Sequence, residues 1–219
     1  MADSFHVITA NRNLAEWATQ FNEHVTIIPN SVDLGKVRQT APSSTHNARP
    51  VIGWIGTPVT AKYLQLLRRP LQALRARHDF VLKVIGAPGF TMAGIDVHAV
   101  PWSEATEADE LSTCDVGVMP LPDDGWARGK SALKLIQYLA AGIAAVASPV
   151  GANCDVLQDG HNGFLAGTDE EWTEKLAVLL EEPRRREQLA RAGRRTVEEH
   201  FSLETNAPVF VEVLQRLIR

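Results

Sequence analysis

The stretch of sequence that decides the predicted fold is DVGVMPLPDDGWARGKSALKLIQYLAAGIAAVASPV, residues 115–150. It begins and ends with apolar runs, at 115–121 and 143–150. Between them lie a loop with Pro and Gly and an amphipathic segment, whose apolar positions 132, 135, 136 and 139 follow helical spacing. Continuous apolar runs of this length are typical of parallel strands covered on both faces. The stretch therefore predicts a strand, a helix and a second strand in succession.

The same alternation continues along the rest of the chain. Further strands are predicted at 5–9, 24–29, 51–56, 80–86, 94–102 and 164–166. Helices are predicted at 13–22, 60–77, 103–114, 169–181, 183–199 and 203–218, with a polar loop at 40–50. We therefore expect an α/β fold: a Rossmann-like, doubly wound and mostly parallel sheet with helices on both faces.

Composition and charge exclude several classes of protein. Apolar residues make up 45% and charged residues 22% of the 219 residues, which is typical of a globular protein and not of a disordered chain. The net charge is −4, so the average surface gives no reason to expect nucleic acid binding. An anionic ligand must therefore be met by a local cluster of cations.

The sequence carries few signals of a cellular compartment or of a metal site. Cys114 and Cys154 lack metal-binding spacing, and we interpret both as reduced, small core residues of a cytosolic protein. The first residues lack the basic start and apolar run of a signal peptide. Residues 135–154 carry no formal charge, but Gln137 and Gly142 interrupt them, which favours a buried helix and strand over a membrane span. We predict no metal and no cofactor.

The first of three loops that follow predicted strands is at 56–62, and such strand ends are where doubly wound sheets bind ligands. Gly56 permits close backbone approach, Thr57 and Thr60 supply hydroxyls, and Thr60 is a candidate helix cap. Lys62 in the first turn opposes the helix dipole unless an anion lies between them. The alternative is a solvated lysine on a capped surface helix.

The second loop, at 86–94, holds three glycines, and the third, at 120–131, carries a cationic cluster. Ser131 is the candidate N-cap of the next helix, so Lys130 precedes that helix and Lys134 lies in its first turn. With Arg128 added, this helix start suits a diphosphate, although a solvated cationic edge is the alternative.

The order of these motifs resembles one family. The matching segments are VTIIPNSVD (25–33), VIGWIGTP (51–58), DVGVMPL (115–121), KLIQYLAAGIAAVASPVGANCDVLQDGHNGFLA (134–166) and FSLETNAPVFVEVL (201–214). They are similar to the C-terminal half of group 1, or family 4, retaining glycosyltransferases of the GT-B fold. The resemblance implies two Rossmann-like domains facing each other across a cleft, of which this chain supplies the one that binds a UDP- or GDP-linked sugar.

The resemblance also implies roles for particular residues. The first and third loops supply the candidates for donor or phosphate binding, and the resemblance places Lys62 where the family has a lysine that contacts the donor phosphates; the candidates are Gly56, Thr57, Thr60, Lys62, Arg128, Lys130, Ser131 and Lys134. Val100, Pro101 and Trp102 would lie beside the nucleotide base. The family usually has two glutamates eight positions apart near the sugar, where this chain has Gly129 and Gln137. GT-B members generally transfer the sugar without a bound metal.

The resemblance further predicts how the chain is divided. Residues 1–40 would be the end of a preceding domain with a linker-like segment, 41–200 the donor-binding domain and 201–219 a C-terminal helix. The chain would then be a donor-binding half, inactive alone, that works with an N-terminal acceptor-binding domain. We expect a cytoplasmic protein of polysaccharide biosynthesis, with at most peripheral contact with the inner face of the membrane.

Two other functions stay open. A non-catalytic module that binds a nucleotide sugar or a partner would tolerate the loss of the glutamate pair. An NAD-dependent oxidoreductase would need a GxGxxG fingerprint, and the first loop offers only Gly53 and Gly56.

Overall fold

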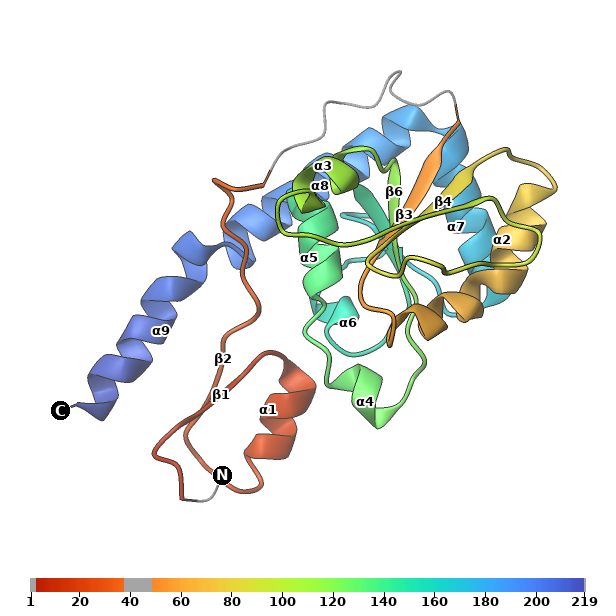
Figure 1. The fold of residues 1–219 in the computed structure, drawn as a ribbon. Coiled ribbons are helices and arrows are strands. Elements are labelled where there is room, and N and C mark those ends of the chain that lie inside the picture. The colour runs from red at the N-terminus through yellow and green to blue at the C-terminus, as the bar shows by residue number, and fades with distance from the viewer. Residues whose placement is uncertain (1–2, 38–48, 219) are drawn as a thin grey trace.

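The computed structural model describes residues 3–37 and 49–218. Most of the predicted loop at 40–50 lies outside these ranges. Within them the chain forms two parallel sheets, one of two strands and one of six (Figure 1). The doubly wound α/β fold predicted from the sequence is confirmed.

The small sheet pairs β1 (Val7–Thr9) with β2 (Val25–Ile27), and α1 (Arg12–Ala18) connects them. We call residues 3–32 the N-terminal unit. It joins the rest of the molecule through a bridge between Val32 and Ser202, and through a hydrogen bond from Asn206 Nδ2 to Ser31 Oγ (2.9 Å). These contacts tie the start of the chain to the beginning of its last helix.

The large sheet has the strand order β5-β4-β3-β6-β7-β8, and every neighbouring pair is parallel. Its strands are β3 (Val51–Ile55), β4 (Val81–Ile85), β5 (Val97–Val100), β6 (Val116–Met119), β7 (Ala144–Ala147) and β8 (Phe164–Leu165). The chain builds outward from β3 to β5, then returns to the other side of β3 with β6. The order therefore reverses between β3 and β6, and such a switch point opens a crevice at the carboxyl ends of the two strands.

Helices cover both faces of this sheet (Figure 1). The 3-10 helix η1 (Ala61–Leu67), α2 (Arg68–Arg75) and α7 (Asp169–Glu181) pack on one face through a core that includes Trp54, Leu71 and Trp172. The other face carries α5 (Leu133–Ala140) and α8 (Pro183–His200). The remaining helices are α3 (Glu107–Ser112), α4 (Gly125–Arg128), α6 (Asn153–Val156) and α9 (Leu203–Leu217).

Tyr138 of α5 fixes that helix to the switch point. Its ring lies over Gly117 in β6, where an added Cβ would come within 2.5 Å of the ring. Its buried hydroxyl accepts a hydrogen bond from the Ile55 amide (3.0 Å) and donates to the Val118 carbonyl (3.4 Å). Burial raises the pKa of this hydroxyl, so it stays protonated and can donate. The second half of α5 is therefore held against β3 and β6.

Several local predictions were wrong. The helix predicted at 60–77 is divided into η1 and α2, and the short helices α4 and α6 were not predicted. Cys154 is exposed and not a core residue, because it lies on the short helix α6 at the surface, whereas Cys114 is buried as expected. Burial raises the pKa of the Cys114 thiol to about 12.

Candidate functional site

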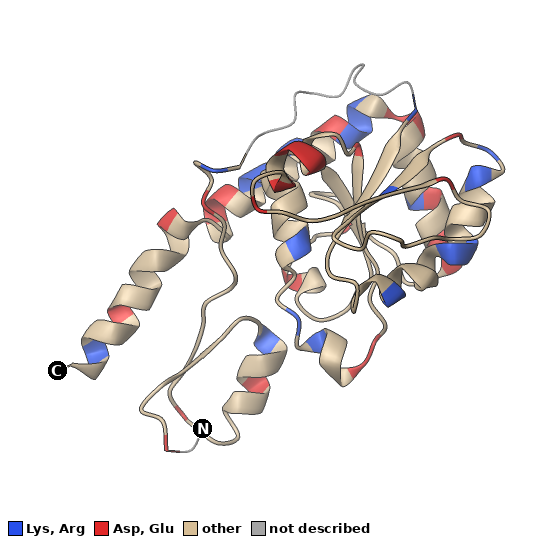
Figure 2. Ribbon diagram, viewed as in Figure 1, with Lys and Arg blue, Asp and Glu red and all other residues tan. Residues whose placement is uncertain are grey.

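The candidate site lies at the switch point, where the loop after β3 meets the start of α5. Figure 2 shows Lys and Arg on α4, on α5 and on the segment that joins them, with acidic residues in the loop just before α4 and charges of both signs over the rest of the molecule. The loops after β3, β4 and β6 are the three that the sequence singled out. They meet at one edge because the carboxyl ends of parallel strands all point the same way.

Lys134 lies at the centre of this site. Its Nζ is 5.0 Å from the centroid of the buried Trp54 ring, and its Cε would lie 2.8 Å from a Cβ added to Gly56. Burial, with a smaller contribution from the positive charge of Lys130, lowers the pKa of Lys134 to about 8. A lysine held partly out of water beside a second lysine is an unfavourable arrangement that an anion would relieve.

Two further lysines share one aromatic ring next to Lys134. Lys62 Nζ lies 5.4 Å and Lys130 Nζ 5.7 Å from the centroid of Tyr63. Lys130 also lies 5.8 Å from the ring of Trp126, which is 75% exposed. Three of the predicted phosphate-binding lysines are therefore gathered around the ends of β3 and α5.

Glu107 links Trp102, which was predicted to lie beside the base, to Gln137, which was predicted to lie near the sugar. Glu107, in the first turn of α3, accepts a hydrogen bond from Gln137 Nε2 (2.7 Å) and another from the Trp102 indole. Gln137 lies one turn after Lys134 on α5, so the two side chains share a face of that helix. Trp102 and Gln137 are thus brought together by a residue that the sequence analysis did not single out.

Gly86 lies between Gly56 and Trp102. Its amide donates to the carbonyl of Val100 (2.9 Å), and its φ is 93°. A Cβ at this position would overlap the carbonyl oxygen of Gly56 and come within 3.3 Å of Trp102. Trp102, Gly86, Gly56, Lys134, Gln137 and Glu107 are therefore successive neighbours in one part of the site, which we call the contact ring.

Arg128, Gly129 and Ser131 have their contacts away from the contact ring and from the lysines beside it. The Arg128 guanidinium binds Asp123 through Nε (2.6 Å) and Nη2 (3.0 Å), which raises the pKa of Arg128 and lowers that of Asp123. Gly129 packs near Leu14, at 3.6 Å from an added Cβ. Ser131 accepts a hydrogen bond from Asn30 (2.8 Å) and faces the N-terminal unit.

Thr60 and Ser131 were predicted to cap helices, but neither side chain makes a capping hydrogen bond. Thr60 stands at the cap position of η1, but its hydroxyl bonds with Thr57 and not with the helix. The residue at the cap of α5 is Ala132, not Ser131, and its φ of 54° is in the left-handed region. Ser131 is instead held by Asn30, so its hydroxyl is directed to the N-terminal unit.

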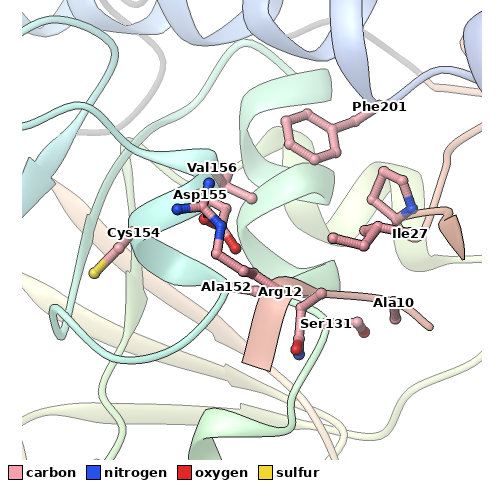
Figure 3. A pocket seen from close by; sticks show the side chains of 11 residues that line it. Ala10, Arg12, Ile27, Ser131, Ala152, Cys154, Asp155, Val156 and Phe201 are labelled. Atoms are coloured by element: carbon pink, nitrogen blue, oxygen red, sulfur yellow. The ribbon is translucent and has the colours of Figure 1, made fainter. Parts of the chain in front are cut away.

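A cavity of about 350 Å³ lies between the N-terminal unit and the rest of the described chain, which we call the main domain (Figure 3). Ile27, Pro29, Val156 and Phe201 supply apolar lining, and Asn11 and Ser131 supply polar groups. Arg12 and Asp155 approach each other at its side with 3.6 Å between their charged atoms. The interface between the N-terminal unit and the main domain, which we call the seam, is therefore only partly packed.

Some kinds of site are missing from the described residues. Within 3–37 and 49–218, no three His, Cys, Asp or Glu side chains gather as a metal site would require. Over the same ranges, no helix combines the length and hydropathy needed to cross a bilayer.

The fold and the site together define a Rossmann-like α/β domain with a cluster of lysines at its switch point. A Rossmann-like arrangement is shared with several solved structures. A sucrose-phosphate synthase from Thermosynechococcus elongatus matches with a TM-score of 0.75 at 17% identity, over 99% of this chain and 59% of that one. Anabaena HepE, solved with UDP-glucose, matches with a TM-score of 0.78 at 15% identity, over 96% of this chain and 64% of that one. The chain thus spans about three fifths of these matched proteins.

A shorter structure matches over almost its whole length. The C-terminal domain of the group 1 glycosyl transferase LpcC from Francisella tularensis has a TM-score of 0.57 at 15% identity, over 78% of this chain and 99% of that one. Comparison with curated protein sequences finds no match. The family model for glycosyl transferases group 1 matches residues 49–182, so the chain belongs to this family. The family resemblance found in the sequence is confirmed.

Proposed function

We propose that the chain binds the nucleoside diphosphate of a UDP- or GDP-linked sugar and serves a retaining glycosyltransferase as its donor-binding half. The observation that carries this proposal is the position of Lys134, largely buried against Trp54 and Gly56 with Lys130 and Lys62 close by. Such an array suits a diphosphate at the end of a parallel sheet. Family membership and the matched HepE–UDP-glucose structure support a sugar nucleotide over other diphosphates.

In this proposal the three lysines act on the leaving group. When the bond between the anomeric carbon and the diphosphate breaks, negative charge grows on the phosphate oxygens. Fixed cations placed at that point stabilise the charge more in the transition state than in the ground state. Lys134 contributes most, because its surroundings exclude water and weaken the screening of its charge.

The contact ring would receive the rest of the nucleotide. Trp102 is 52% exposed and offers an aromatic face to a base, and Glu107 offers carboxylate oxygens to hydroxyl groups. Gln137 stands where the resemblance places a glutamate, and its link to Glu107 keeps a carboxylate beside that position. The loss of the second family glutamate is therefore compatible with a polar, acceptor-rich pocket.

The proposed partner is a preceding domain that binds the acceptor. The N-terminal unit and α9 expose large apolar side chains, among them Phe5, Phe21, Phe210 and Leu217. Residues of the N-terminal unit and of α9 line a second cavity of about 820 Å³. A further domain packed there would cover this surface, and transfer would need it. The division at residues 40 and 200, the cytoplasmic location and a role in polysaccharide synthesis remain predictions.

Calorimetric titration of the chain with UDP and with GDP tests the proposal. We expect heat from at least one of them, and Lys134→Ala should weaken that binding by more than tenfold, because it removes the most desolvated cation. Lys36→Ala, which removes a charge from an exposed lysine outside the contact ring, is the matched control and should change little. Absence of binding at millimolar UDP and GDP would overturn the proposal. Binding of NADH in their place would favour the oxidoreductase alternative.

A further inference from the structure

Asn11 crosses the seam between the N-terminal unit and the main domain. It is 3% exposed and stands at the N-cap of α1. Its amide nitrogen donates to the carbonyl of Lys130 (2.9 Å) and to that of Arg128 (3.3 Å), which are 119 and 117 residues further along the chain. One buried side chain thus connects the first helix to the loop that carries the cationic cluster.

The bonding of Asn11 uses its whole amide group. Its Oδ1 accepts from the Leu14 amide (2.8 Å), which fixes the orientation of the side chain and leaves both amide hydrogens for the two carbonyls. Asn30 adds a second tie through Ser131 (2.8 Å). The loop 128–131 is therefore held by two asparagines of the N-terminal unit, at both of its ends.

On the side of the N-terminal unit, the loop 128–131 lies near the apolar Leu14 at Gly129 and next to a cavity. The cavity of about 350 Å³ lies there, and Asn11 and Ser131 are part of its lining (Figure 3). On another side, the Arg128 backbone lies against Gly151, whose added Cβ would come within 2.8 Å of the Arg128 carbonyl oxygen. On the side of the seam, the Lys130 backbone is therefore held by the hydrogen bond from Asn11, while its ammonium group lies near Tyr63 and Trp126.

We infer that Asn11 is a positioning residue of the proposed donor site: by holding the carbonyls of Arg128 and Lys130, it sets where Lys130 meets the phosphates. This inference rests on the proposed function, because it takes Lys130 to be a phosphate contact. It makes the N-terminal unit part of the donor site although no side chain of that unit lies in the contact ring. A shift of the N-terminal unit would then change donor affinity.

Asn11→Ser separates the two roles of the side chain. Serine is as good an N-cap as asparagine, so α1 keeps its cap, but the two donors to the loop are lost. We expect UDP or GDP, whichever binds the wild-type chain, to bind about tenfold more weakly. Asn22→Ser, in the same unit, is the matched control, because the hydrogen bonds of Asn22 to Ser4 and His24 stay within the unit.

A double-mutant cycle with Lys130→Ala distinguishes positioning from a general loss of structure. If Asn11 acts through Lys130, Asn11→Ser should have little further effect on nucleoside diphosphate affinity in the Lys130→Ala chain. An equal loss in both backgrounds would overturn the inference, and so would an affinity of Asn11→Ser equal to that of Asn22→Ser. Should Asn11→Ser fail to fold, Asn11→Thr keeps a capping hydroxyl and fills more of the volume of asparagine, and it removes the same amide donors. If the wild-type chain binds neither nucleotide, the proposed function and this inference both fall.

Discussion

Lys134 combines a positive charge with a largely buried position, and these two properties are linked. Burial against Trp54 and the nearby charge of Lys130 lower its pKa to about 8 from the usual 10.5. The fold therefore disfavours the charged form, and this penalty on stability is present below pH 8 and disappears as the pH rises from 8 to 10.5. A bound diphosphate would reverse the preference by giving the ammonium group a partner.

Donor affinity should therefore depend on pH. The protonated lysine binds phosphate and the neutral amine does not, so the affinity for UDP or GDP should fall as the pH rises above about 8, approaching tenfold per pH unit. Titrations at pH 7, 8 and 9 would measure this. Lys134→Arg is the control, because a guanidinium stays charged over this range. Equal pH dependence in the wild type and Lys134→Arg would show that another group is responsible.

Gln137 and Glu107 form a pair whose charge can be altered. Gln137→Glu would place a second carboxylate at the position of an amide 2.7 Å from Glu107. Repulsion should destabilise the chain by about 1–2 kcal/mol at neutral pH, since one carboxylate must take up a proton or move away. Glu107→Gln in the same chain should restore stability by exchanging the roles of the pair. Denaturant unfolding of the two single variants and the double variant would measure the coupling.

Glu107 shows why the contact ring could not be read from the sequence. Lys134 and Gln137 were found because they follow recognisable helix-start and family patterns. Glu107 lies 30 residues before Gln137, on another helix, and its own pattern only indicated a helix start. Asn11 is separated from its loop by more than 100 residues. Contacts of this kind depend on how the elements pack, and no local spacing records them.

At the scale of elements, Gly86 and Gly89 offer a direct comparison within one loop. Both have φ of 93°, but a Cβ at Gly86 would overlap the Gly56 carbonyl, whereas one at Gly89 would meet nothing within 4 Å. Gly89→Ala should cost about 1 kcal/mol for the backbone alone. Gly86→Ala should cost more than about 3 kcal/mol and weaken UDP or GDP binding, because β3 and β4 must move apart at their ends. Denaturant unfolding of both variants would test this, and equal losses would contradict it.

The strands and long helices were predictable because their apolar spacing also matches their burial. In β3, Ile52 and Trp54 face one core and Ile55 the other. The start of α5 was not predictable from Ser131, a good cap residue in isolation. Asn30 takes that hydroxyl, and the chain turns through the left-handed Ala132. Tertiary contacts thus override local preference at the mouth of the proposed donor site, where strained backbone is often found.

At the scale of the molecule, α9 is poorly supported by the rest of the described chain. Of its 15 residues, only Asn206 and Val213 are buried, although Phe210, Leu214 and Leu217 are large and apolar. An isolated helix of this length is marginally stable in water. We therefore expect the amides of α9 after Val209 to exchange with deuterium much faster than those at the centre of α8. Mass-spectrometric hydrogen exchange would show this, and equal protection would mean that another contact covers α9 in solution.

The long sequence separation between Asn11 and the loop 128–131 also affects the order of events during synthesis of the chain. During synthesis at about 5–20 residues per second, the N-terminal unit would wait on the order of ten seconds before the Arg128 and Lys130 carbonyls are made. Throughout that interval the amide of Asn11 lacks both of its carbonyl partners. The ability to hold a donor should therefore be among the last properties that a nascent chain acquires.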